Sequence, residues 1–349
     1  MKNKPMYMIV KEYILSRIKK GELSPEDRIP SEKELMDLFQ VSRITVRKAI
    51  DELAIEGYIY RLQGIGTFVQ KPPQKAQIVS SKLVGVFLTT ASDILSVGIL
   101  RGLEEYLSTI GFHPVVQFSD NDENSEKEKL DRLLQLQVAG FIILPHLCSL
   151  SDQTLLDLVK QKKPVVFVDR TIEGLGYHSV QSDNQKGAYD IARHLLEIHH
   201  YKNIAFVSWE STKVSSVRER FHGAKKACDE FGGTIQLVQI EKPQIKELHL
   251  LTKKFDAIFA CTDLLAVEII SHLQSYNIRI PEDIAVVGFD DRPFSEFIQP
   301  KLTTVRQYPE KIGEKAAAVL ISLLAWNNVD EQVHYVPTKL VVRNSCGCK

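Results

Sequence analysis

The hydrophobic positions change their spacing at about residue 82. Beyond it, apolar runs rich in Val and Ile alternate with stretches whose apolar residues recur three and four positions apart. Buried strands separated by helices indicate a parallel sheet covered on both faces. Because this part is longer than one ordinary domain, we expect two α/β lobes. The predicted strands are residues 83–88, 113–118, 140–144, 164–169, 203–208, 257–261 and 284–290.

Ahead of that change, residues 31–55 predict two short helices joined by a tight turn. Ser31 and Glu34 stand at capping-box spacing, so the first helix should begin at about Glu32. Ser42 is the expected N-cap of the second helix, which should run to about Ile55. Such a pair forms a helix-turn-helix unit, although a plain helical hairpin has the same outline.

The charges of the second helix favour DNA binding over the plain hairpin. Arg43, Arg47 and Lys48 lie in its first two turns, whereas Asp51 and Glu52 lie near its far end. A helix that enters a major groove by its N-terminal end needs this polarity, because phosphates repel an acidic end. Arg43 and Arg47 are four residues apart, so both can reach guanine edges in one groove.

Two glycines follow in the stretch LQGIGTFV, residues 62–69. A phosphate-binding loop is excluded because Val69 stands where a third glycine belongs and the next residues, QKPPQ, cannot start a helix. The alternating pattern instead predicts a β-hairpin with Gly64 and Gly66 at its turn. Such a wing could approach a minor groove, with Gln63 reaching a base edge or a phosphate.

Residues 5–70 closely resemble the winged helix-turn-helix of GntR-type bacterial transcription regulators. The likeness rests on the helix, the turn, the Arg-x-Thr-x-Arg run and the wing glycines, all in family order. Ile44 departs from the polar residue more usual there, so a contact with a thymine methyl and an altered operator preference are expected. The resemblance implies DNA contacts from Lys33, Arg43, Ile44, Thr45, Arg47, Gln63 and Gly64.

Polar residues follow several strands of the second part. Asp169 and Asp290 each end a predicted strand, Thr262 follows another, and Arg220 lies on a nearby helix. Open α/β sheets bind ligands at the carboxyl ends of their strands. Carboxylates, a guanidinium group and a hydroxyl that converge there can bind several sugar hydroxyls at once. The simpler alternative is that each acid caps the helix after it.

An enzyme is not expected. The chain has no G-x-S-x-G, H-E-x-x-H or S-x-x-K motif. Asp290 and Asp291 are adjacent, so on a strand they point to opposite faces and cannot flank one bond. Two rivals stay open at this point: a transport-type sugar-binding protein, and a sugar-modifying enzyme carrying a DNA-binding head.

Residues 83–346 look like the effector domain of LacI-type repressors, which shares its fold with periplasmic sugar-binding proteins. The likeness rests on the runs VRERFHGAKKAC, IPEDIAVVGFDDRPF and LVVRNSC, among others. Leu95 and Ser96 stand where sugar-binding relatives often place aromatic rings, and the hinge-helix sequence is missing, so neither ring stacking nor hinge insertion is carried over. The resemblance implies ligand contacts from Asp93, Asp169, Arg170, Arg220, Thr262, Asp290 and Gln307.

Together the two resemblances imply a GntR/LacI hybrid repressor. We expect an α+β winged helix-turn-helix domain over residues 1–71, a linker over 72–82, and an α/β two-lobed periplasmic-binding-protein-like domain over 83–349. The expected partners are an operator in double-stranded DNA, a small sugar that releases the protein from it, and a second copy of the chain. A pentose, L-arabinose first, is the expected sugar, and no cofactor is expected.

The composition indicates the cellular compartment in which the protein works. The 349 residues carry 44 basic and 44 acidic side chains, and no signal peptide or run of 18 apolar residues is present. The cysteines are odd in number and mostly lie in apolar runs, which suits a reducing, cytoplasmic interior. No metal is expected at Cys346 and Cys348, because no His or second Cys pair follows at zinc-site spacing, and His199 and His200 suit a solvated helix end. The cysteines are Cys148, Cys228, Cys261, Cys346 and Cys348.

Overall fold

The computed structural model describes residues 5–55, 58–62, 66–70, 81–120, 123–145, 164–171, 178–326 and 333–348. Two compact units are present: Met1–Lys82 with Ala318–Asp330, and Leu83–Ala317 with Glu331–Lys349. The predicted linker, 72–82, lies outside the described residues except for its last two positions, so its bounds stay a prediction. No described helix is both long and apolar enough to cross a membrane.

The first unit contains the two predicted helices and, before them in the chain, one additional helix. The Ser31 hydroxyl accepts a hydrogen bond from the Glu34 backbone N–H at 3.3 Å, and the Glu34 carboxylate accepts one from the Ser31 N–H at 2.7 Å, which confirms the capping box. Gln40 ends the first predicted helix with φ +50°, in the left-handed region that begins the tight turn. The helices are α1 (Met6–Lys19), α2 (Glu32–Phe39) and α3 (Arg43–Ile55).

The predicted hairpin follows α3. Strands β1 (Ile59–Leu62) and β2 (Gly66–Val69) pair antiparallel, with Ile59 opposite Val69. The turn itself, which includes Gln63 and Gly64, lies outside the described residues. The core that joins helices and hairpin consists of Val10, Ile14, Leu23, Ile29, Leu35, Val46, Ala49, Ile50, Leu53, Ile59 and Val69.

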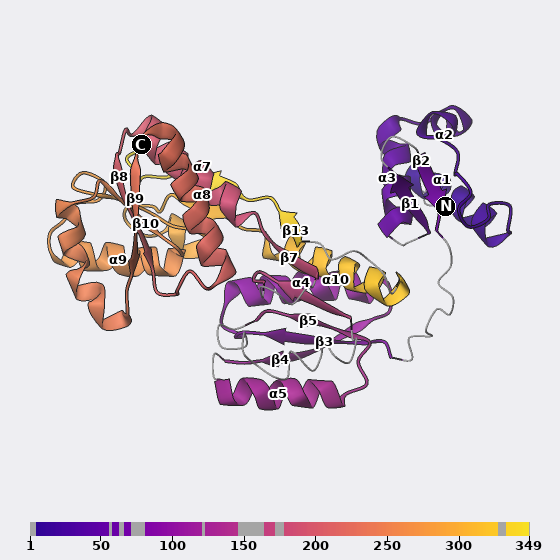
Figure 1. Cartoon of the computed structure of the whole chain (residues 1–349), viewed down its shortest axis with the longest axis horizontal. Coiled ribbons are helices and arrows are strands. Elements are labelled where there is room, and N and C mark those ends of the chain that lie inside the picture. The colour runs from indigo at the N-terminus through magenta and orange to yellow at the C-terminus, as the bar shows by residue number, and fades with distance from the viewer. Residues whose placement is uncertain are drawn as a thin grey trace. The chain divides into compact units, whose positions relative to one another are not determined.

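The second unit begins with a lobe built on a six-stranded parallel sheet. Its strand order is β13-β7-β6-β5-β3-β4. Helix α5 covers one face, while α4 and α10 lie on the other (Figure 1). We call this the first lobe. Its elements are β3 (Leu83–Leu88), α4 (Ile94–Thr109), β4 (His113–Phe118), α5 (Glu123–Gln135), β5 (Gly140–Ile143), β6 (Val165–Val168), β7 (His178–Ser182), α10 (Pro309–Trp326) and β13 (Val333–Val336).

The second lobe has a four-stranded parallel sheet in the order β11-β10-β8-β9, joined by a two-stranded antiparallel piece. Phe206 and Phe259 pack edge to face at 5.1 Å in its core. Its elements are α7 (Asn184–Ile198), β8 (Asn203–Ser208), α8 (Ser215–Phe231), β9 (Thr234–Gln239), the 3₁₀ helix η2 (Lys242–Lys253), β10 (Ala257–Ala260), α9 (Asp263–Ser275), β11 (Ala285–Val287), the 3₁₀ helix η3 (Pro293–Glu296), β12 (Thr304–Arg306) and β14 (Lys339–Val341).

The chain passes between the lobes three times, from β7 to α7, from β12 to α10, and from β13 to β14. The expectation of two lobes crossed by several segments is confirmed. The crossings bring the strand ends of both lobes into one unit, and the polar residues predicted at those ends lie beside them.

Candidate functional sites

The start of α3 presents a group of cations held by one acid. The Arg43 Nε atom lies 2.8 Å from a Glu32 carboxylate oxygen, and the Arg47 Nε atom lies 3.9 Å from the other oxygen. The two arginine side chains are 70% and 59% exposed. A DNA phosphate or guanine edge can therefore replace Glu32 as the partner of these arginines without disturbing the fold of the first unit.

The other predicted DNA-contacting residues differ in whether they already have a partner within the protein. Ile44 is 81% exposed, so its apolar side chain is available to a partner. The Thr45 N–H donates to the Ser42 hydroxyl at 3.3 Å, as expected of an N-cap, and the two hydroxyls lie 2.9 Å apart. Lys33 is exposed on α2. Lys48 instead lies over the Tyr7 ring at 4.0 Å, which ties α3 to α1.

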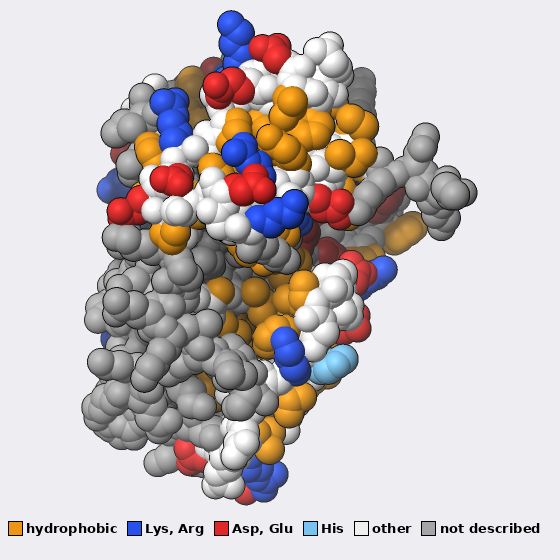
Figure 2. Space-filling model, turned by 90° about the vertical axis from the view of Figure 1, so that its right-hand side faces the viewer, with side chains coloured by type: hydrophobic (Ala, Val, Ile, Leu, Met, Phe, Trp, Pro, Cys, Tyr) orange, Lys and Arg blue, Asp and Glu red, His pale blue; other side chains and the backbone are white. Residues whose placement is uncertain are grey.

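The acidic end of α3 has a structural partner, since the Glu52 carboxylate pairs with the Lys11 ammonium at 2.9 Å. On the face of the first unit seen in the upper part of Figure 2, blue and red side chains are interspersed around orange ones. This face of the first unit is therefore not uniformly basic.

In the second unit, Arg220 is the centre of the predicted effector site. Its side chain is only 6% exposed. The guanidinium group donates to the Asn184 side-chain oxygen at 2.8 Å and to the Cys261 backbone carbonyl at 2.7 Å. It also stacks 3.9 Å from the centroid of the Phe289 ring. These contacts hold one edge of the guanidinium group fixed while Asp290 lies 3.7 Å from Nη1.

Asp290 connects Arg220 to Gln307 and, through Arg292, to the first lobe. Its carboxylate accepts a hydrogen bond from the Gln307 amide at 2.6 Å and one from Arg292 Nε at 3.4 Å. Arg292 in turn donates to Asp93, at the start of α4 in the first lobe, at 2.6 Å. Burial raises the pKa of Asp290 to about 7, against the opposing effect of Arg220 and Arg292.

Asp169 and Arg170 form the other wall. Asp169 is 3% exposed, and burial raises its pKa while Arg170 and Arg220 oppose the rise. Arg170 lies 3.6 Å from the Asp169 carboxylate and 3.1 Å from that of Glu210, which belongs to the second lobe. Asp169, Arg170, Arg220, Asp93 and Asp290 therefore belong to one electrostatic cluster.

The alternative that these acids are helix caps fails for Asp93 and Asp290, since the helix after Asp290 has Arg292 as its N-cap. Asp93 precedes α4 but makes no cap hydrogen bond with its side chain, whereas Asp183 does cap α7. Asp169 and Asp290 have φ values of +63° and +134°, in the region that ordinary side chains avoid. Backbone strain at strand ends is typical of ligand sites.

Thr262, which is not one of these acids, is itself a helix cap. Its hydroxyl oxygen accepts the Leu265 N–H at 3.3 Å as the N-cap of α9. The neighbouring Asp263 is structural as well, because its carboxylate accepts the Ser295 hydroxyl at 2.7 Å and the Arg292 N–H at 2.8 Å. Thr262 can still donate its hydroxyl proton, but Asp263 has its acceptors occupied.

Several buried polar atoms of this cluster have no hydrogen-bond partner among the described residues. Buried polar atoms are nearly always paired, so such a concentration points to a polar ligand. The described set contains both acceptors and donors, which suits hydroxyl groups. It comprises Asp169 Oδ1, Arg170 Nε and Gln307 Oε1.

Two residues of the cluster were not predicted from the sequence. Arg292 stands two positions after Asp290, and its place beside a strand end is a signal that could have marked it. Glu210 follows the carboxyl end of β8, which is the same kind of signal. Ser96 is fully buried and bonded to Thr89 at 3.1 Å, so it does not face a ligand.

Known proteins resemble the chain over both units. Residues 6–69 match the model of bacterial regulatory proteins of the gntR family, and residues 192–346 match the periplasmic binding protein-like domain. The arabinose metabolism transcriptional repressor of Geobacillus stearothermophilus is 31% identical over 99% of this chain and 98% of its own length. That of Halalkalibacterium halodurans is 32% identical over 97% and 96%.

Among solved structures, a LacI family transcriptional regulator from Enterococcus faecium with bound ribose has a TM-score of 0.62 and 24% identity, covering 75% of this chain and 98% of its own. That likeness shows the fold. The matches to both family models and to full-length relatives confirm the two resemblances recognised in the sequence. The chain belongs to the DNA-binding transcriptional repressors that join a gntR-family domain to a periplasmic binding protein-like domain.

Proposed function

We propose that this repressor works in the cytoplasm as a homodimer, and that a pentose, L-arabinose first, releases it from a pseudo-palindromic operator. The choice of sugar is supported by the two full-length relatives, which are named for arabinose metabolism. A ribose-bound LacI family regulator of the same fold is consistent with a pentose-sized ligand. Activity on the sugar is not part of the proposal, since the relatives are transcription regulators.

The unpaired buried atoms around Arg220 are the observation that carries the sugar site. A pentose presents several hydroxyl groups, each both donor and acceptor, and the cluster offers Asp169 Oδ1 and Gln307 Oε1 as acceptors and Arg170 Nε as a donor. Asp290 and Arg220 add a carboxylate and a guanidinium group. We assign Thr262 a donor role, and Asp93 a role through its ion pair with Arg292.

Operator recognition is assigned to the start of α3. Arg43 and Arg47 would exchange Glu32 for base edges in the major groove, Ile44 would contact a thymine methyl, and Lys33 and Thr45 would bind phosphates. The wing would place Gln63 and Gly64 at the adjacent minor groove, as the family resemblance implies. Phosphate contacts make the affinity fall steeply with salt.

The two functions are coupled by a change in the dimer. Asp169 and Asp93 belong to the first lobe, whereas Arg220 and Asp290 belong to the second, so a sugar held by all four stabilises one arrangement of the lobes. In a dimer, that arrangement would alter the spacing of the two DNA-binding units. The sugar then weakens operator binding because it favours the arrangement that fits the two half-sites less well.

The test is operator affinity measured with and without each pentose, after a thermal-shift screen of monosaccharides and sugar phosphates. The repressor–inducer scheme predicts weaker binding with L-arabinose, and tighter binding would overturn it. Recovery of the sugar unchanged after incubation separates binding from turnover. If no sugar of the screen raises the melting temperature or alters operator binding, the effector assignment fails.

Two variants separate the sites. Asp290→Ala should abolish the response to sugar and leave operator affinity intact, while the exposed control Asp229→Ala should change neither. Arg47→Ala should leave sugar binding unchanged and relax base specificity, costing about 1–3 kcal/mol at the contacted base pair. An Asp290→Ala protein that still responds to sugar would contradict the assigned site.

A further inference from the structure

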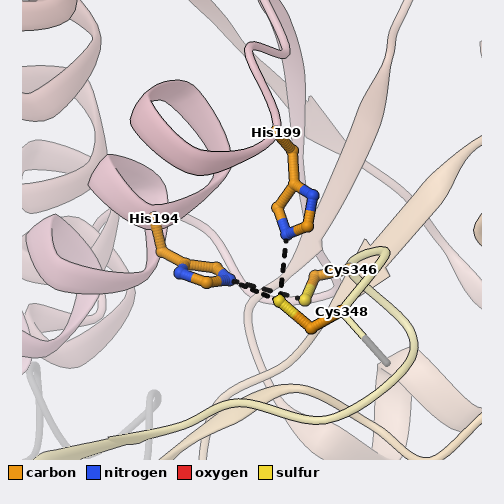
Figure 3. Close-up of side chains that lie close together, drawn as sticks. All are labelled: His194, His199, Cys346 and Cys348. Atoms are coloured by element: carbon orange, nitrogen blue, oxygen red, sulfur yellow. Dashed lines mark hydrogen bonds between the residues drawn. The ribbon is translucent and has the colours of Figure 1, made fainter.

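The end of the chain forms a side-chain cluster that neither DNA nor sugar binding uses. His194 lies in the last turns of α7, and His199 is the C-cap of that helix. Cys346 and Cys348 lie at and just after the turn that follows β14. Figure 3 shows the two imidazole rings and the two thiols pointing toward one another.

The distances within the cluster fit a tetrahedral metal site. The Nε2 atom of His194 lies 3.5 Å from the Cys346 sulfur and 3.6 Å from the Cys348 sulfur, and His199 Nε2 lies 3.4 Å from the Cys348 sulfur. Zinc bonds of about 2.3 Å to sulfur and about 2.0–2.1 Å to nitrogen place tetrahedral ligands about 3.6 Å apart. All four ligand atoms lie within 4.8 Å of one another.

The surroundings position these ligands. The Thr303 hydroxyl donates to the Cys346 sulfur at 3.2 Å, and the Cys346 thiol donates to the Arg343 carbonyl at 3.4 Å. The Tyr201 hydroxyl donates to the Cys346 carbonyl at 3.2 Å, and the Tyr201 ring stacks on His199 with 5.4 Å between centroids. Supports of this kind orient ligands and limit their motion.

The residue between the two cysteines must be small. Gly347 has φ +109°, and a Cβ atom there would lie 3.0 Å from His199 Nδ1. The glycine therefore lets both sulfurs turn toward the histidines. The His pair has the H-x₃₋₅-H spacing usual in zinc sites, while the Cys-Gly-Cys pair is one residue closer than the usual spacing, which the left-handed backbone at Gly347 makes possible.

We propose that His194, His199, Cys346 and Cys348 bind one Zn²⁺ ion as a four-coordinate structural site. Two neutral imidazoles and two thiolates neutralise the ion, so the bound site carries no net charge into the half-buried surroundings. Zinc is favoured over harder cations because the ligands are sulfur and imidazole nitrogen. The ion fastens the end of the chain to α7, which is packed in the second lobe.

From the sequence no metal was expected at Cys346 and Cys348, because no histidine stands near them at zinc-site spacing. His194 and His199 do have zinc-site spacing between themselves, but they stand about 150 residues earlier in the chain. The expectation that His199 is a solvated helix end is wrong, because the fold packs it half-buried beside Cys348 and Tyr201.

The test uses tag-free, full-length protein, stripped with a chelator under reducing conditions and titrated with Co²⁺ and then Zn²⁺. One equivalent of Co²⁺ should give the intense visible bands of tetrahedral cobalt with sulfur-to-metal charge transfer, and one equivalent of Zn²⁺ should displace it. Zinc should also raise the melting temperature, independently of sugar and operator.

Variants locate the ion. Cys348→Ser and His199→Gln should each weaken Co²⁺ binding at least 100-fold, whereas His200→Asn, changed at the exposed neighbour, should bind as the parent does. The absence of charge-transfer bands in the parent protein, or equal binding by Cys348→Ser and His199→Gln, would overturn the proposal. So would a Cys346–Cys348 disulfide in protein kept under thiol reductant.

Discussion

Replacing Arg220 by methionine tests whether the effector site is organised around that guanidinium group. The change removes charge-assisted hydrogen bonds to Asn184 and Cys261 and the 3.7 Å contact with Asp290, while keeping most of the side-chain volume. Breaking a buried ion pair costs about 3–5 kcal/mol, and each hydrogen bond from a charged group is worth about 1.5–3 kcal/mol. Part of this is offset, because a buried guanidinium group is no longer desolvated.

The expected loss of unfolding free energy in Arg220→Met depends on what happens to Asp290. It keeps its contacts with Arg292 and Gln307 after the change, so the loss should lie near the lower limit, about 3 kcal/mol at neutral pH. Since Arg220 lowers the pKa of Asp290, which burial raises to about 7, its removal should raise that pKa further. At pH 6 Asp290 is then protonated and leaves no unpaired charge, so Arg220→Met should lose less unfolding free energy than at pH 7.5.

The assay is urea unfolding at pH 7.5 and at pH 6, followed by fluorescence. The chain has two tryptophans, so a Trp326→Phe background leaves Trp209, in the second lobe, as the reporter. Lys225→Met, an exposed position on the same helix, is the control and should cost less than about 0.5 kcal/mol. A cost for Arg220→Met below about 1 kcal/mol, or one that does not depend on pH, would refute the reasoning.

Four other outcomes are expected. Because the folded-state pKa of Asp290 is raised, its stabilising contribution is largest below its ordinary pKa and is lost as pH rises through about 7; the melting temperature of the parent relative to Asp290→Asn should therefore fall between pH 5 and pH 8, and a constant difference would count against it. Glu32→Gln should tighten operator binding at low salt about 2- to 5-fold, since Arg43 no longer has to leave an exposed ion pair worth about 0.2–1 kcal/mol; unchanged affinity in a gel-shift or anisotropy titration would show that Arg43 does not contact DNA. Ile44→Ala should leave the melting temperature within about 1 °C of the parent, because the side chain is 81% exposed, yet reduce discrimination between thymine and cytosine at one operator position, measured with single-substitution duplexes. Gly223→Ala should destabilise the second lobe by about 1–3 kcal/mol in urea, because a Cβ atom would lie 2.1 Å from the Gln185 carbonyl oxygen where α8 crosses α7; an unchanged midpoint would show that the helices can separate freely.

The sequence predicted the elements whose signals are local. The capping residue Ser31 fixed the start of α2 at Glu32, and the predicted strand bounds of β3, β4 and β8 agree with the structure to the residue. Strands β7, β9, β12, β13 and β14 were missed. Strand β7 has the sequence HSVQS, which is polar yet entirely buried, and strand β9 alternates and lies at a sheet edge. Neither has the continuous apolar run that marks a central strand.

The residues of the candidate sites also divide into those with a local signal in the sequence and those without one. Asp169 and Asp290 were predicted because strand ends can be read from the sequence, and Arg220 because the family resemblance marks it; the structure brings the three into one cluster. Arg292 was missed because its function depends on Asp93, 199 residues earlier. The cluster at Cys346 depends likewise on His194. Contacts between distant segments require the fold, and no spacing rule reports them.

The edge strand β13 has a consequence for synthesis of the chain. It comes from residues 333–336 but pairs in parallel with β7, which is complete by Ser182. During translation, the backbone groups along β7 must wait for some 150 further residues, and an uncovered edge of this kind readily pairs with another polypeptide. Nascent chains that stall before Val333 should therefore be the aggregation-prone species, and chaperones that shield strand edges would act in that interval.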